Sequence, residues 1–135
     1  MSIMRQLDSP VAREPLRIET IQATILEIPL VRPHRVAVFS IDKQSIVLVR
    51  VRTADGTEGV GEGVVPGGPW WGGESVEGMH AMIQAYLAPL LIGEDASRID
   101  FLAQRINKLI AGASFAKAAV EMALWGGLHH LYVRV

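Results

Sequence analysis

The chain has 135 residues, of which 50% are hydrophobic and 20% are charged. A length of this order suits a single domain, whose core buries roughly two-thirds of the surface that the unfolded chain exposes. Thirteen Lys and Arg residues against 14 Asp and Glu residues give a formal net charge of -1, which indicates no general attraction to nucleic acid or to an anionic membrane. The sequence has no cysteine, which excludes disulfides, thiol catalysis and cysteine-ligated zinc and fits a cytoplasmic location.

The first segment, residues 1–16, contains two prolines and mixed charges without periodicity, a pattern typical of a flexible tail. It has no apolar run of signal-peptide length, and no segment of the chain is long enough to span a membrane.

A strand-like alternation follows over residues 17–30, but its phase changes. Ile21 and Ile25 share one parity, whereas Leu26 and Leu30 share the other, so we expect a bulge near Ile25 and Leu26. Residues 31–35 read as a loop, because proline at position 33 removes a donor from the ladder.

Two further strands are indicated beyond this loop. Residues 45–53 alternate in parity, with Val47, Val49 and Val51 on one face. Asp55 and Gly56 supply a hairpin turn, and a third strand continues to position 64. The three strands are expected to be antiparallel.

The apolar period then changes from two to three or four residues, which predicts three helices. The first spans residues 76–91 and ends near Gly93, the second covers 99–110, and the alanine-rich third covers about 115–125. The expected caps are Ser75, Ser97 with Asp100 as a capping box, and Ser114. Because strands and helices are segregated, the fold class is α+β, a three-stranded meander followed by a bundle of about three helices.

A glycine-rich run, residues 59–63, superficially looks like a phosphate-binding loop. It lies inside a predicted strand, opens no helix, and has no following Lys-Ser or Lys-Thr pair. We therefore reject nucleotide binding.

Five stretches together carry a family resemblance. They read IPLVRPHR (28–35), SIVLVRV (45–51), DGTEGVGE (55–62), GGPWWGGES (67–75) and FAKAAVEMALW (115–125). In combination they resemble the N-terminal capping domain of the muconate cycloisomerase branch of the enolase superfamily.

The resemblance implies a cap over a modified eight-stranded barrel that converts cis,cis-muconate, or its chlorinated relatives, to a lactone. In such enzymes the barrel carries the lysine acid and base and holds a divalent metal, manganese or magnesium. We therefore expect this chain to bind no cofactor, to contain no catalytic residue and to be inactive alone. A dicarboxylate substrate is expected only when a barrel is supplied.

The resemblance also implies a division of the chain into a tail (1–16), a capping domain (17–125) and a C-terminal segment (126–135) that replaces the path into the barrel. The last segment reads GGLHHLYVRV. An internal deletion and a frameshift both remain open as its origin. A cap without its barrel is also expected to expose an apolar face and to self-associate through it.

Four residues are the candidate substrate-binding positions: His34, Pro66, Trp70 and Trp71. His34 brings a titratable cation to a basic loop that includes Arg32 and Arg35, although exposed basic residues are usually only solvated. Two tryptophans in a glycine-rich loop suit the closing of a lid over a flat conjugated substrate. For Trp70, packing onto the helices of the cap itself is an equal alternative.

Two classes of function follow from the sequence. The chain is either the substrate cap of a cycloisomerase or a non-catalytic remnant that acts as an interaction module. Within the enzyme class, the cap of a related epimerase, racemase or succinylbenzoate synthase is the alternative, because cap loops diverge readily.

Overall fold

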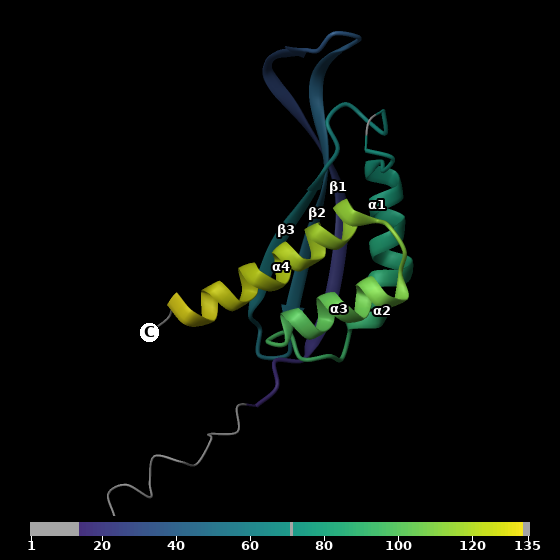
Figure 1. Cartoon of the computed structure of the whole chain (residues 1–135). Coiled ribbons are helices and arrows are strands. Elements are labelled where there is room, and N and C mark those ends of the chain that lie inside the picture. The colour runs from purple at the N-terminus through teal and green to yellow at the C-terminus, as the bar shows by residue number, and fades with distance from the viewer. Residues whose placement is uncertain (1–13, 71, 134–135) are drawn as a thin grey trace, which may run out of the picture.

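The computed structural model of the chain describes residues 14–70 and 72–133. Within these residues the sheet has the order β1-β2-β3, formed by β1 (Ile18–Arg35), β2 (Ser40–Thr53) and β3 (Glu58–Val64). The helical segments that follow are α1 (Val76–Met82), the π-helical turn η1 (Ile83–Leu87), α2 (Ala88–Leu91), α3 (Ile99–Leu109) and α4 (Ser114–Val133). The α+β fold is confirmed, with an antiparallel meander that does not close into a barrel (Figure 1).

The core lies between one face of the sheet and the helices. Val47, Val49 and Val51 of β2 point into it and are at most 3% exposed, which confirms the predicted parity of this strand. The helices contribute fully buried residues at three- and four-residue spacing, namely Met79, Ile83, Leu87, Leu91, Leu102, Ala116, Ala119, Val120 and Ala123. α4 crosses the sheet diagonally, and the far end of the β1–β2 hairpin extends beyond the helices (Figure 1).

The predicted bulge near Ile25 and Leu26 was wrong. β1 pairs with β2 without a shift from Thr20 to Pro29, and the irregularities lie between Ile18 and Thr20 and beyond Pro29. Ile25 and Leu26 are 39% and 37% exposed. Both faces of this part of β1 are only partly covered, so neither Ile25 nor Leu26 is buried in the core. The apolar residues therefore change parity along a strand that is regular.

The predicted loop at residues 31–35 was also wrong, because these residues continue β1. Beyond an irregularity in the register, His34 pairs with Ile41 and Arg35 pairs with Ser40, so β2 begins at Ser40 rather than at the predicted position 45. Proline at position 33 is tolerated because β1 is an edge strand, where one side needs no donor. We call residues 29–43, which form the protruding end of this hairpin, the arm.

The first predicted helix is present, but its middle is π-helical. Ser75 caps it as expected, since its Oγ accepts a hydrogen bond from the Gly78 amide at 3.0 Å. The helical path is continuous over residues 76–91 but includes the π-helical turn η1, and Gly93 beyond it adopts a φ of 87°. A glycine is favoured there because only it takes this conformation without strain.

The capping box predicted from Ser97 and Asp100 was wrong. α3 starts at Ile99 after Arg98, whose side chain makes no cap hydrogen bond. Ser97 instead donates its hydroxyl to Asp95 Oδ1 at 2.7 Å and its amide to the same oxygen at 3.0 Å. Burial raises the pKa of Asp95, but the hydrogen bonds from Ser97 and Leu16, with the charge of Arg98, outweigh it, so the pKa lies below its ordinary value.

The third helix, predicted to end near Trp125, continues as α4 to Val133. Two glycines inside it, Gly126 and Gly127, lie against β3. Reciprocally, a Cβ on Gly59 would stand 1.9 Å from the Ala123 carbonyl oxygen, and one on Gly61 would stand 2.1 Å from the Ala119 carbonyl oxygen. The glycine-rich run 59–63 therefore permits the backbones of β3 and α4 to approach closely.

Candidate functional site

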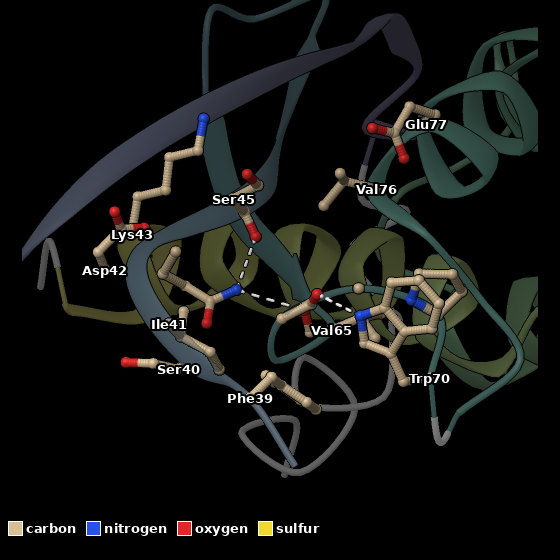
Figure 2. A pocket seen from close by; sticks show the side chains of 14 residues that line it. Phe39, Ser40, Ile41, Asp42, Lys43, Ser45, Val65, Trp70, Val76 and Glu77 are labelled. Carbon is tan, nitrogen blue, oxygen red and sulfur yellow. Dashed lines mark hydrogen bonds between the residues drawn. The ribbon is translucent and has the colours of Figure 1, made fainter. Parts of the chain in front are cut away.

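Two adjoining hollows lie at the base of the arm. The arm hollow, about 440 Å³, is lined by Leu30, Val31, Arg32, Pro33, His34, Ile41, Gln44 and Pro66. The loop hollow, about 310 Å³, is lined by residues 39–45 of β2 and its approach, by Val65, by 67–70, and by Val76 and Glu77 (Figure 2). Ile41 and Gln44 line both.

Gln44 joins the two sides of this site. Its Nε2 donates to the Ser45 carbonyl oxygen at 2.9 Å and to the Val65 carbonyl oxygen at 3.3 Å. The second bond connects β2 to the start of the loop 66–74. Sequence reasoning missed Gln44, because a single glutamine before a strand carries no pattern that distinguishes it.

His34 and Pro66 were predicted at substrate-binding positions, and both line the arm hollow although they are 32 residues apart. His34 is exposed on β1, opposite Ile41. Arg32 lines the same hollow, and no carboxylate is among its lining residues. The arm hollow therefore offers the Arg32 guanidinium and the His34 imidazole to an anion beside an apolar wall. Arg35 is exposed and lies outside this lining.

Trp70 lies on the loop hollow and is 71% exposed. Its Nε1 donates to the Gly67 carbonyl oxygen at 2.7 Å, and the indole stands over Gly68, where a Cβ would meet Nε1 at 2.8 Å. Trp70 is therefore not part of the buried core, and its ring rests on its own loop. Trp71 lies outside the described residues.

The charges around the loop hollow are mixed. Asp42, Lys43 and Glu77 line it, and Lys43 donates to Glu27 Oε1 at 2.8 Å. The hydrogen bond and the charge of Glu27 raise the pKa of Lys43 above its ordinary value. Both side chains are more than half exposed, so this ion pair contributes little to stability.

The far end of the loop 66–74 is attached to α4. Glu74 accepts hydrogen bonds from the Phe115 amide at 2.9 Å and from the Ala116 amide at 3.2 Å. This contact of Glu74 was not foreseen from the sequence. No local signal identifies it, because the partners lie 41 and 42 residues away.

The residues that the structure describes contain no group of three or more His, Asp or Glu side chains placed to hold a metal ion. The family resemblance assigns the divalent metal to the barrel, and these described residues offer no set of ligands for it. In the same described range, no helix combines the length and the hydropathy needed to cross a membrane.

The open α+β fold with a glycine-rich loop and a hairpin arm beside one site defines a capping-type domain. Residues 20–128 match the family model for the mandelate racemase / muconate lactonizing enzyme, N-terminal domain. The chain belongs to this family.

The relatives within the family are cycloisomerases. Over an aligned stretch of 109 residues the chain is 51% identical to muconate cycloisomerase 1 of Rhodococcus opacus. The aligned stretch covers 81% of this chain and 29% of the relative. Chloromuconate cycloisomerase of Cupriavidus necator is 44% identical with the same coverage. The chain thus corresponds to the N-terminal domain of such enzymes and spans about 29% of their length.

The solved structures agree. The structure of 2-chloromuconate cycloisomerase from Rhodococcus opacus 1CP aligns with a TM-score of 0.83 and 51% identity, covering 86% of this chain and 31% of that one. Muconate lactonizing enzyme from Pseudomonas fluorescens, complexed with muconolactone, aligns with a TM-score of 0.83 and 39% identity, over 87% of this chain and 32% of that one.

Proposed function

We propose that residues 17–125 form the substrate cap of a muconate cycloisomerase-like enzyme, and that the arm and the loop 66–74 cover a small dicarboxylate. One observation carries the proposal: His34 of the arm and Pro66 and Trp70 of the loop 66–74 line two hollows that share Ile41 and Gln44.

The chemistry of these side chains suits such a substrate. Arg32 provides a cation and His34 an imidazole hydrogen-bond donor for a carboxylate, and a neighbouring aromatic ring suits a flat conjugated chain and excludes water. Trp71 is proposed as a second cover at the same loop, from its place in the GGPWWGGES stretch. The names of the relatives favour muconate and chloromuconate over the substrates of epimerases, racemases or succinylbenzoate synthases.

In this proposal the proton transfers and the divalent metal belong to the barrel of such an enzyme, which residues 17–125 do not include. The chain alone, with manganese or magnesium added, should therefore show no lactone formation from muconate. Metal-dependent turnover by the purified chain would refute the assignment of the chemistry to the barrel. The cytoplasm is the proposed location, because a chain without cysteine suits a reducing compartment.

The test is a fusion in which residues 17–125 replace the corresponding cap of the Rhodococcus opacus relative. The fusion should form lactone. Trp71→Ala in it should cost about 1 to 3 kcal/mol in transition-state stabilisation, measured as kcat/KM, and Trp70→Ala and His34→Ala should also lower kcat/KM. Tyr86→Ala is the matched control, since Tyr86 is an exposed aromatic residue on η1 and lines neither hollow.

An active fusion in which Trp70→Ala, Trp71→Ala and His34→Ala all leave kcat/KM unchanged for every muconate tested would contradict the proposed cap function. Equal losses from these variants and from Tyr86→Ala would show a general effect on folding instead.

A further inference from the structure

Glycine makes the backbone of the loop 66–74 adaptable. Gly67, Gly68 and Gly73 adopt φ angles of 68°, 121° and 72°, a region that other residues rarely take. The described residues of the loop, 66–70 and 72–74, form no helix or strand. The position of Trp70 beside the loop hollow therefore depends on the contacts that fix the two ends of the loop, in addition to its hydrogen bond to Gly67.

At its first end the loop leaves β3 through Val65, which is 2% exposed. The Val65 carbonyl oxygen accepts hydrogen bonds from Gln44 Nε2 and from the Gly68 amide at 3.4 Å. This end is thus fixed to the sheet.

The second end is fixed by Glu74. Its two carboxylate oxygens accept separately from the amides of Phe115 and Ala116. Next to this contact the loop runs over the Phe115 ring, because a Cβ on Gly72 would lie 3.0 Å from Phe115 Cε2. Glu74 is half-buried in this arrangement.

The first turn of α4 is well suited to receive a carboxylate from elsewhere. Its amides have no acceptor within the helix, and the helix has no acidic residue in its first turn. A carboxylate at that position gains from the helix dipole and makes charge-assisted hydrogen bonds. Ala116, Ala119 and Val120 of α4 are fully buried, so the helix is a firm point of attachment.

We propose that Glu74 is a positioning residue, whose carboxylate tethers the loop 66–74 to the N-terminus of α4 and so sets where Trp70 stands beside the loop hollow. It contacts α4 and does not line the loop hollow, so it acts through Trp70. The inference rests on the proposed cap function, which assigns Trp70 to the substrate.

If Glu74 only capped α4, its removal would destabilise that helix and leave the loop 66–74 in place. The experiment must therefore measure the mobility of Trp70. The chain has three tryptophans, and the full chain with Trp71→Phe and Trp125→Phe leaves Trp70 as the single emitter. In that background Glu74→Ala should lower the steady-state fluorescence anisotropy of Trp70 by about a third, as a released loop moves on the nanosecond scale. Glu74→Gln keeps an acceptor oxygen without the charge and should fall between.

Ser75→Ala is the matched control. It removes a helix cap at the next residue, but on α1 rather than α4, so the anisotropy of Trp70 should stay unchanged. Circular dichroism verifies that each variant is folded, and Glu74→Gln carries the test if Glu74→Ala does not fold. Unchanged anisotropy in the Glu74 variants, or an equal fall in Ser75→Ala, would overturn the tether.

The fusion enzyme separates this inference from the proposed function. Glu74→Ala there should raise KM by about tenfold, which corresponds to about 1.4 kcal/mol, with a smaller change in kcat, and Ser75→Ala should leave both within about twofold. If Trp70→Ala and Trp71→Ala raise KM but Glu74→Ala does not, the positioning role is refuted. If anisotropy falls while none of the three variants changes KM, the cap function is refuted and the tether stands.

Discussion

Asp55 shows how one residue fixes a turn. Its Oδ1 accepts from the Thr53 hydroxyl at 2.5 Å and from the Thr57 amide at 3.0 Å, and its Oδ2 accepts from the Thr57 hydroxyl at 3.1 Å. The hydrogen bond from Thr53 is the largest of the influences that hold the pKa of Asp55 below its ordinary value of 3.8. Gly56 completes the turn with a φ of 86°, as the Asp-Gly pair predicts.

This network predicts a pH dependence of stability. Because the folded state lowers the pKa of Asp55, the ionised carboxylate stabilises the fold above pH 3.8, and this contribution is lost as the pH falls through the lowered pKa. Asp55→Asn should therefore cost about 0.5 to 1 kcal/mol at pH 7, a modest figure because the group is exposed. The cost should shrink toward pH 3.

Urea unfolding at pH 7 and at pH 3 measures this difference. Asp42→Asn, a change at an exposed carboxylate on β2, is the control and should show no comparable pH-dependent cost. An Asp55→Asn cost that stays constant or grows toward acid would contradict the role given to the ionised carboxylate.

At the scale of elements, the contact between β3 and α4 is made by glycine. Gly59 and Gly61 face the helix from the sheet, and Gly126 and Gly127 face the strand from the helix. The opposite face of β3 carries Glu58 and charged neighbours, exposed to solvent. One face of β3 therefore carries glycines, which let the backbone of α4 approach the strand closely.

Gly61→Ala should therefore destabilise the fold by about 3 kcal/mol or more, since the added Cβ would stand 2.1 Å from a backbone oxygen of a buried helix. Gly63→Ala is a matched control on the same face. Its Cβ would first meet the Met79 Sδ at 2.9 Å, the end of a flexible side chain, so a cost of about 1 kcal/mol is expected. Denaturant unfolding compares the two, and equal costs would contradict the proposed backbone contact.

At the scale of the whole molecule, the helices cover one face of the sheet, and apolar side chains remain exposed elsewhere. Val31 and Val38 of the arm are almost fully exposed, and Met122 and Trp125 of α4 are about half exposed. α4 itself is apolar around most of its circumference, which is typical of helices buried on several sides.

We therefore expect the isolated chain to self-associate and to bind a hydrophobic dye. Sedimentation should show a weight-average mass that rises with concentration. Met122→Lys combined with Trp125→Glu should reduce both effects without loss of helix content. A monomer that binds no dye over the accessible concentration range would rule out the exposed apolar face as an interaction surface.

The sequence by itself determined the element order, the fold class and the parity of the central strand. These features follow from local periodicity: Val47, Val49 and Val51 alternate, and Ser75 and Gly56 have the side-chain and backbone chemistry that their cap and turn require. The family stretches in the sequence also identified the capping domain before any contact was known.

Only the tertiary structure decided which features came together over long separations. The sheet extends β1 through the expected loop at 31–35 because an edge strand tolerates Pro33, and α4 continues through Gly126 and Gly127 because β3 presents glycines opposite them. Glu74 and Gln44 each bond to a partner 21 to 42 residues away. Contacts between distant segments depend on how the elements pack, which residue periodicity does not encode, so the attachment of the loop 66–74 became visible only in three dimensions.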